Sequence, residues 1–526
     1  MSLSKSYWLN AFVILLFATV FFLLFKNFLP EKLFPDTVKE SEHIVVDEWM
    51  QKALIEEEVQ NKDTVEGKPL KTVKEIILDA EKIASKDSLT SKFVETQNEP
   101  EVTPIEDKGF EKDIYLNNFF HNLSALEEQP ETRKLRIAYF GDSMTDGDMI
   151  VQDLRKLFQT EFGGEGVGFV PIISESASSR GSIKHSFSNN WMMRTYMKTY
   201  DTIYPYGVNG QVFYQIDSVL PTYLYLSSGL YAKGKALKNS KLYYGKAKTN
   251  DAKIVVKTPN DTIEKLLEPL QKVNTISLSQ NPTQSLDIEF VGTDSIPFYG
   301  VNFDSPNGII IDNYSSRGNS GLPITQLNVQ LMREFQKSLH YDLIVLHYGT
   351  NVLSSGNFNY SWYQSRMERV VDHLRSSFPQ TSILVISIAD KATKYETKMQ
   401  TDSAVAYLLG SQRAFAKNKK TGFIDLFHLM GGENSMVEWV ESEPEKANKD
   451  YTHFNHRGAK HIAKLIYNEI KKEFKIYKKQ QLALELEKEK QRIQDSIQEA
   501  KEKEAIELQR LNEEQQEKDT VHVSKK

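Results

Sequence analysis

The first hydrophobic stretch lies at the N-terminal end of the chain. Residues 7–25 are apolar except for Asn10 and Thr19, and a lysine flanks the run on each side. This length is close to the roughly 20 residues that span a bilayer. Because no small-x-small cleavage site follows, the pattern predicts an uncleaved transmembrane signal anchor over residues 1–28, with a cleaved signal peptide as the alternative.

Residues 29–110 show no regular hydrophobic period. Short apolar patches lie among many Glu, Lys, Asp and Thr residues, and prolines interrupt any long helix at Pro35, Pro69, Pro100 and Pro104. This composition predicts a partly disordered tether, which would hold the following domain away from the membrane.

Strand-like and helix-like patterns then alternate. The strand-like apolar runs are residues 135–140, 342–346, 383–388 and 423–427. Helical patterns follow them, the first carrying Ile150, Leu154 and Phe158. Near-continuous apolar strands alternating with helices predict a three-layer α/β/α domain around a parallel sheet. We assign residues 111–181 and 306–475 to this domain.

The stretch between these two parts has a different pattern. Short strand candidates separated by turn residues occur at residues 223–226, 241–244, 253–256 and 286–291. Spacing of this kind predicts an inserted β-sandwich over residues 182–305. Its many tyrosines are expected mainly in the sandwich core, with one or two free to stack on a sugar: Tyr204, Tyr206, Tyr223, Tyr225, Tyr243 and Tyr244.

The tail, residues 476–526, contains neither Gly nor Pro and is dense in Glu, Lys and Gln. Leu486, Ile493, Ile497 and Ala500 give only a broken heptad. The pattern predicts a solvated charged helix, with self-association through this helix as the alternative.

Composition narrows the classes of function. The 526 residues suggest roughly three domains. The formal net charge is −6, so the chain lacks the basic character of a nucleic-acid binder. The absence of cysteine excludes a disulfide framework, a thiol nucleophile and a Cys-ligated zinc.

Four short blocks carry candidate chemistry, and two of them follow predicted strands directly. Ser143, in Gly-Asp-Ser, lies between a strand and a helix whose first N–H groups could face a developing oxyanion. Asn351 follows a later strand, and its side-chain amide could donate to the same oxyanion. Each block alone is also typical of an ordinary turn.

The other two blocks are a glycine and a carboxylate–imidazole pair. Gly318, in Arg-Gly-Asn-Ser-Gly, would let a backbone N–H approach a ligand closely. Asp450 precedes His453 by three residues, close enough to hold the imidazole in one tautomer while its other nitrogen accepts a serine proton. With His456 the same residues could ligate a metal, but that reading leaves Ser143, Gly318 and Asn351 unexplained, so we expect no metal and no cofactor.

The order of the blocks (Ser, Gly, Asn, Asp-x-x-His) resembles the SGNH (GDSL) hydrolase superfamily. The resemblance implies a serine esterase with Ser143 as nucleophile, His453 as general base and Asp450 orienting His453. It also implies an oxyanion hole made by the backbone N–H groups of Ser143 and Gly318 and the side chain of Asn351.

Residues 134–475 more narrowly resemble bacterial peptidoglycan O-acetylesterases, in which a carbohydrate-binding-module-like β domain interrupts the SGNH domain. Met144 and Asp146 depart from the His and Ala often found after the family's serine. The resemblance implies removal of acetyl groups from an O-acetylated glycan. The anchor implies a single-pass protein of the cell membrane, with its catalytic domain on the periplasmic or extracytoplasmic side.

Two alternatives of function stay open. The same triad could transfer the acetyl group to a glycan hydroxyl, or the chain could be a non-catalytic wall-binding protein. Among other residues, His347 is expected in the core, and Asp142, Asp390 and Asp425 are expected in turns or caps. The glycine-rich residues 163–168 lack the ending of a phosphate loop and are expected to border the active site.

Overall fold

The computed structural model describes residues 115–523, with gaps at 199–203, 217–219, 230–235 and 250, and also Glu48 and Met50. The predicted anchor and nearly all of the predicted tether lie outside the described residues. Within the described part of the chain, no helix has the length and apolar character needed to cross a bilayer.

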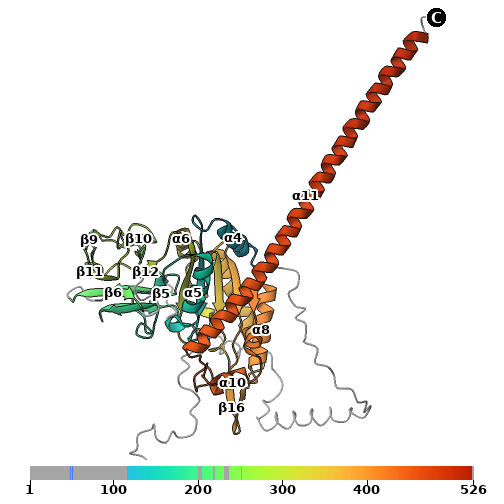
Figure 1. Cartoon of the computed structure of the whole chain (residues 1–526). Helices are drawn as coiled ribbons and strands as arrows, with labels where there is room; N and C mark the ends of the chain where they lie inside the picture. The colour runs from blue at the N-terminus through green and yellow to red at the C-terminus, as the bar shows by residue number, and fades with distance from the viewer. Residues whose placement is uncertain are drawn as a thin grey trace, which may run out of the picture. The chain divides into compact units, whose positions relative to one another are not determined.

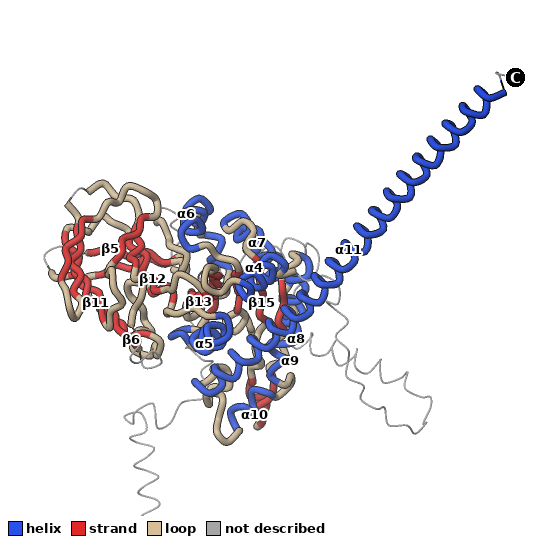
Figure 2. The backbone as a smooth tube through the Cα atoms, turned by 45° about the horizontal axis from the view of Figure 1, so that its top comes forward, coloured by secondary structure: helices blue, strands red, loops and turns tan. Residues whose placement is uncertain are grey.

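A five-stranded parallel sheet forms the centre of the α/β domain (Figures 1 and 2). In spatial order its strands are β13 (Gly308–Ser315), β1 (Lys134–Gly141), β14 (Leu343–His347), β15 (Ser382–Ile386) and β18 (Gly422–Ile424). Every neighbouring pair is parallel, so all carboxyl ends meet at one edge. Ligands of such sheets bind outside that edge.

Helices cover both faces of the sheet, because successive side chains of a buried strand point to opposite sides. Phe140 of β1 packs in one hydrophobic cluster and Tyr139 in the other. The first cluster is closed by α6 (Val329–Leu339), α7 (Ser361–Ser377) and α8 (Val405–Asn418). The second is closed by α4 (Asn117–Glu128), α5 (Val151–Phe162), α10 (Ser435–Glu441) and the start of α11 (His456–Val523). The predicted α/β fold with a parallel sheet is confirmed.

The residues that lie between β1 and β13 in the sequence form two antiparallel sheets, and these sheets enclose a third hydrophobic cluster. One contains β10 (Asn274–Ser277), β7 (Lys241–Tyr244), β12 (Phe298–Phe303), β5 (Gln211–Gln215), β4 (Trp191–Thr195) and β2 (Gly168–Val170). The other contains β3 (Ile183–Phe187), β6 (Thr222–Ser228), β11 (Ser285–Val291), β8 (Lys253–Lys257) and β9 (Thr262–Leu266). Since β2 pairs with β12, this unit takes in residues before the expected boundary at 182.

The structure differs from the sequence expectations at three further places. The strand expected over 423–427 ends at Ile424, because the Asp425 side chain accepts the His428 N–H at 3.1 Å and begins α9 (Leu426–Met430). A hairpin of β16 (Ala392–Tyr395) and β17 (Lys398–Thr401) was not expected. The domain boundary expected at residue 476 falls inside α11. Two short 3-10 helices, η2 (Asp146–Asp148) and η4 (Leu322–Gln326), complete the elements.

The glycine-rich loop after α5 lies at the opposite edge of the sheet from the one expected. The N–H of Ile309, at the start of β13, donates to the carbonyl of Gly163 at 3.0 Å. Because α5 returns along the sheet from the end of β1, its last turn reaches the amino ends of the strands. The expectation that residues 163–168 border the active site is therefore wrong.

Candidate active site

The structure brings Ser143, His453 and Asp450 into one hydrogen-bonded row at the carboxyl edge of the sheet. Ser143 follows β1, and the other two residues immediately precede α11. Ser143 Oγ lies 2.9 Å from His453 Nε2, and His453 Nδ1 lies 2.9 Å from Asp450 Oδ2. Both contacts have the length of good hydrogen bonds although 307 residues of sequence (143 to 450) separate the serine from the aspartate.

Asp450 is held as an ionised partner for the imidazole. Its Oδ1 accepts the backbone N–H groups of Thr452 at 3.0 Å and His453 at 2.9 Å. Burial opposes ionisation, but the hydrogen bonds from His453 and Thr452 outweigh it and hold the pKa of the Asp450 carboxyl below its usual range. A carboxylate in this state favours the tautomer with the proton on Nδ1, which leaves Nε2 free to accept a proton from Ser143.

The turn that presents Ser143 depends on its two neighbours. A Cβ at Gly141 would overlap Thr145 Oγ1, so only glycine fits where the strand turns back. Asp142 is buried, and its Oδ1 accepts the N–H of Met144 at 2.9 Å. Burial raises the pKa of Asp142 to about 6, against opposing effects from this hydrogen bond and from His453. Asp142 therefore serves the turn, as expected for a residue at a strand end.

Gly318 and Asn351 lie in the loops after the strands on either side of β1. Gly318 has a φ of 77°, a region that side chains disfavour, so the loop geometry requires glycine there. Asn351 is 5% exposed, and its Nδ2 donates to the carbonyl of Asn319 at 3.2 Å. A side-chain amide nitrogen carries two hydrogens, so this bond fixes the amide and leaves its second N–H for a ligand.

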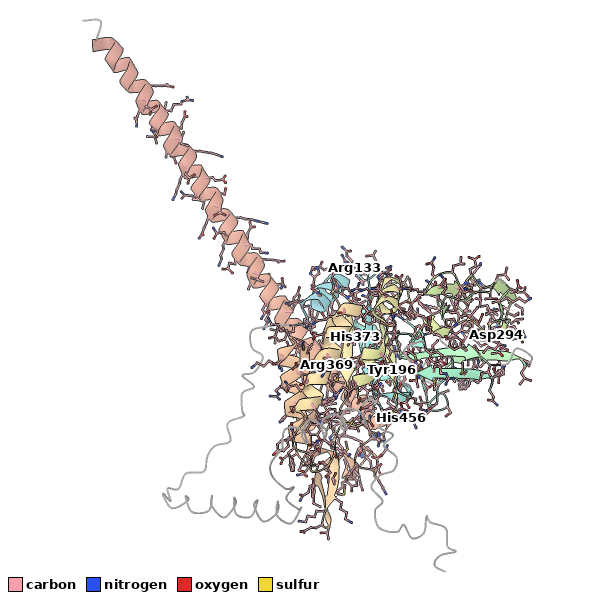
Figure 3. The ribbon with its side chains drawn as sticks, turned by 180° about the vertical axis from the view of Figure 1, so that it is seen from behind. Arg133, Tyr196, Asp294, Arg369, His373 and His456 are labelled. Carbon is pink, nitrogen blue, oxygen red and sulfur yellow. The ribbon has the colours of Figure 1, made fainter. Side chains whose placement is uncertain are left out.

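Asn319 is a residue of the site that the sequence did not reveal. It is fully buried, its Oδ1 accepts the N–H of Gly321 at 2.8 Å, and its Nδ2 donates to the hydroxyl of Tyr196 at 3.2 Å. Tyr196, labelled in Figure 3, directly follows β4 of the inserted sandwich. The insert therefore contacts the loop that carries Gly318, and nothing in the local sequence signals a contact over 123 residues.

One exposed cation stands beside this loop. Arg317 precedes Gly318, and its side chain is 61% exposed while its Nε donates to Asp146 Oδ2 at 2.6 Å. The other oxygen of Asp146 accepts the Ser176 hydroxyl at 2.7 Å. Asp146 therefore orients an arginine at the edge of the site. This is the residue that departs from the Ala often found after the serine in the family that the sequence resembles.

The remaining candidates have structural partners. His347 is buried, its Nδ1 lies 2.8 Å from the Tyr139 hydroxyl, and burial lowers its pKa to about 4. Asp390 accepts the N–H of Met436 at 2.8 Å. His456 is the first residue of α11 (Figure 3). Among the described residues, no group of three or more His, Cys, Asp or Glu side chains lies close enough to hold a metal ion.

Lys391 is a second residue that the sequence did not single out. Burial lowers the pKa of its ammonium group, and the nearby carboxylates of Asp402 and Asp450 oppose that shift. The next residue, Ala392, donates its N–H to the carbonyl of Tyr451 at 3.0 Å. The hairpin after β15 therefore supports the segment that carries Asp450 and His453.

Comparison with known proteins identifies the fold. A solved structure of a peptidoglycan O-acetylesterase matches with a TM-score of 0.56 at 20% identity, over 68% of this chain and 96% of that chain. This match shows that the chain shares the fold of that peptidoglycan O-acetylesterase. No family model matches the chain, and no curated protein gives a significant match.

Two further solved structures match more weakly. A family two carbohydrate esterase from Cellvibrio japonicus has 10% identity and a TM-score of 0.24, over 56% of this chain and 98% of that chain. An acetyl xylan esterase has 16% identity and a TM-score of 0.24, over 31% of this chain and 81% of that chain. Scores of this size do not by themselves establish a shared fold.

Proposed function

We propose that this protein is a membrane-anchored serine esterase that removes O-acetyl groups from an envelope polysaccharide, with O-acetylated peptidoglycan as the substrate. The observation that carries the proposal is the row of hydrogen bonds from Ser143 through His453 to Asp450. A nucleophile, a base and an orienting carboxylate in this geometry can activate a serine for acyl transfer.

The proposed reaction uses two steps. Ser143 Oγ attacks the acetyl carbonyl carbon while His453 Nε2 takes the hydroxyl proton. The N–H groups of Ser143 and Gly318 and the Asn351 amide stabilise the tetrahedral oxyanion. His453 then returns the proton to the departing sugar oxygen, which leaves an acetyl-serine.

Water completes the cycle. His453 Nε2 takes a proton from the attacking water, a second tetrahedral oxyanion forms in the same hole, and collapse releases acetate while Ser143 Oγ regains its proton. No metal or cofactor takes part in the proposed reaction.

Three features support a glycan as the substrate. The fold is shared with a peptidoglycan O-acetylesterase, although identity at this level establishes the fold alone. Tyr223 and Tyr225 point to the less buried side of β6 in the insert, whereas Tyr206, Tyr243 and Tyr244 are buried. On the catalytic domain, the exposed rings of Phe358 and Tyr407 lie 5.0 Å apart. Exposed aromatic faces of this kind can stack on sugar rings.

The predicted anchor over residues 1–28 supports the proposed location. An apolar segment at the N-terminus followed by a tether would place the esterase outside the cytoplasmic membrane, within reach of the cell wall. We propose a single-pass membrane protein whose partners are the membrane and an O-acetylated glycan, with no nucleic acid.

The decisive experiment compares acetate release from O-acetylated peptidoglycan, O-acetylated xylan and a plain acetate ester, with Ser143→Ala as the matched control. We expect wild-type protein to deacetylate peptidoglycan with the highest kcat/KM. A preference for xylan would overturn the substrate. Acetyl transfer to an added glycan, without free acetate, would instead establish a transferase, and no turnover of any ester would favour a wall-binding protein.

A further inference from the structure

The long helix α11 has two parts with different surroundings. Its first turns pack on the catalytic domain through buried residues that include Ile466, Ile470, Phe474 and Tyr477. From Leu482 to Glu514 every side chain is exposed. The helix continues unbroken through this second part (the red helix of Figure 1).

The exposed part carries a regular apolar stripe that repeats every 11 residues. Three columns of positions form it: Leu482, Ile493 and Glu504; Leu486, Ile497 and Leu508; Glu489, Ala500 and Leu511. Seven of these nine positions are apolar. Because α11 is one continuous helix, the residues that form only a broken heptad fit a nearly complete 11-residue repeat.

An 11-residue repeat has a defined geometry. Eleven residues occupy three helical turns, so each residue advances by about 98° and the three columns stay within roughly 33° of one line. A stripe this narrow fits the seam of a two-stranded coiled coil better than the wider face that packs on a globular core. The repeat predicts a slight right-handed supercoil.

The two edges of the stripe carry opposite charge. Glu485 and Glu507 lie roughly 65° to one side of the central column, and Lys490 and Lys501 lie as far to the other side. In a parallel pair of identical helices, the acidic edge of one copy faces the basic edge of the other. An antiparallel pair would bring like charges together, which is unfavourable.

We propose that residues 482–511 of α11 form a parallel, in-register, two-stranded coiled coil with a second copy of this chain. The seam begins five residues beyond Tyr477, the last buried residue of the domain-packing part, so the catalytic domain keeps its contacts with α11. Pairing would cover the exposed Leu482, Leu486 and Ile493 and their counterparts further along the helix.

The natural absence of cysteine makes a clean test possible. Leu482→Cys and Leu511→Cys are made singly in the full chain, in membranes, and oxidised. The matched controls are Leu484→Cys and Ile506→Cys, which replace equally apolar, exposed residues on the opposite face of the helix. Disulfides require Cα atoms within about 7 Å.

We expect disulfide-linked dimers from both seam variants and from neither control. Because the ends of the stripe lie about 44 Å apart along the helix, only a parallel, in-register pair brings both 482 and 511 next to their own copies. Equal cross-linking of the controls, or none at 482 and 511, would overturn the proposal. Cross-linking at Ile497→Cys alone would overturn the parallel arrangement.

A second measurement does not depend on oxidation. Sedimentation of the detergent-solubilised full chain should show a dimer that becomes a monomer when Ile493→Lys and Ile497→Lys are combined. The paired control, Leu484→Lys with Ile506→Lys, should remain a dimer. A monomeric wild-type chain, or a dimer insensitive to the seam substitutions, would contradict the proposal.

Discussion

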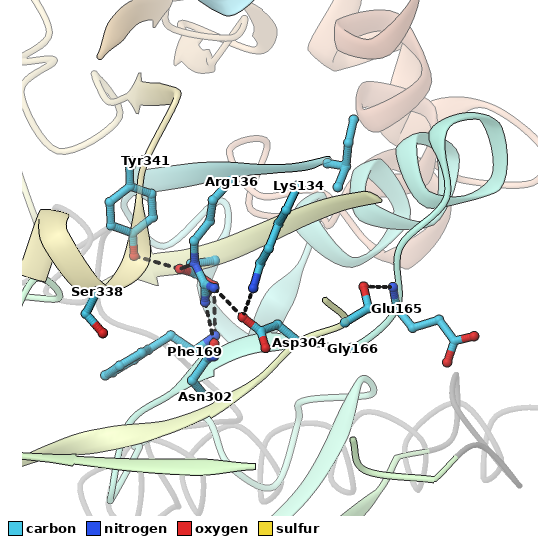
Figure 4. Close-up of polar contacts among 12 residues, drawn as sticks. Lys134, Arg136, Glu165, Gly166, Phe169, Asn302, Asp304, Ser338 and Tyr341 are labelled. Atoms are coloured by element: carbon cyan, nitrogen blue, oxygen red, sulfur yellow. Dashed lines mark hydrogen bonds and ion pairs between the residues drawn. The ribbon is translucent and has the colours of Figure 1, made fainter. Parts of the chain in front are cut away.

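Strand β1 carries a polar cluster at each of its ends, and the two clusters have opposite character. Near its start, Arg136 is 1% exposed and donates to both oxygens of Asp312, at 2.7 and 2.9 Å, and to Asp304 at 2.9 Å (Figure 4). Beyond its other end, Ser143 and His453 are only partly buried, and the Asn351 amide retains an N–H for a ligand.

The two clusters differ in whether their polar groups keep hydrogen-bonding capacity for a ligand, and this distinguishes structural groups from groups that can take part in a reaction. In the Arg136 cluster the charges are buried and paired, and Asn302, Tyr314 and Tyr341 take up further hydrogen-bonding capacity. Buried, fully satisfied charges fix geometry and have little left to offer a substrate. The row of Ser143, His453 and Asp450 is fixed on the Asp450 side by hydrogen bonds and is open on the Ser143 side.

The largest effect that separates the two clusters is expected from Ser143→Ala. Loss of the nucleophile should lower kcat by a factor on the order of 10⁴ to 10⁶, with little change in the free energy of unfolding. Steady-state acetate release and urea denaturation measure the two quantities. A large fall in the free energy of unfolding that accounts for the fall in kcat would show that Ser143 is structural.

Arg136→Met should produce the reverse pattern. Removing the guanidinium leaves the buried Asp312 without a cationic partner, whereas Asp304 keeps its ion pair with Lys134. Breaking a buried pair in this way costs about 3–5 kcal/mol of stability. Urea denaturation should show this loss, while kcat per folded molecule stays near that of the wild type. Arg375→Met is the control, because its guanidinium is exposed and, within the described part of the chain, donates only to backbone carbonyls.

Asn351→Ala should lower kcat by about 10²- to 10³-fold, or about 2.7–4 kcal/mol, with KM nearly unchanged. The Asn351 amide would act only on the oxyanion, which is absent from the bound ester. Steady-state kinetics on a plain acetate ester separates the two constants. A change in KM alone would place Asn351 in substrate binding instead.

The smallest effect concerns the pH dependence of stability. The folded-state pKa of Asp142 is about 6 against an ordinary value of 3.8, so the folded protein holds this proton more tightly than the unfolded chain does. The resulting stabilisation is fully present below pH 3.8 and is lost as the pH rises to about 6. The Asp142→Asn variant has no ionisable group at this position, so it serves as the reference that lacks this pH-dependent stabilisation.

The difference in the free energy of unfolding, wild type minus Asp142→Asn, should therefore fall by up to about 3 kcal/mol between pH 4 and pH 7. Urea denaturation at intervals across this range measures it. A difference that stays constant with pH would show that Asp142 titrates normally in the folded protein.

The sequence predicted that Ser143, His453 and Asp450 would meet, because short motifs beside regular elements carry them. Ser143 directly follows a strand, and the other two immediately precede a helix. The parallel sheet was predictable for a similar reason, since its buried strands are near-continuous apolar runs. The Arg136 pairing with Asp304, 168 residues away, has no local signal, because burial of an arginine is a property of the tertiary structure. The same holds for the contact between Tyr196 and Asn319. The helix predicted beyond residue 476 is confirmed as far as Val523, because no Gly or Pro interrupts that stretch.

The central claim is that Ser143 is the nucleophile, and covalent labelling tests it most directly. The wild-type chain is treated with a serine-reactive fluorophosphonate, and the modified peptide is mapped by mass spectrometry. We predict a single label on Ser143, loss of acetate release in proportion to labelling, and slow labelling of His453→Ala. A label on another serine, or continued hydrolysis by protein fully labelled at Ser143, would contradict the claim.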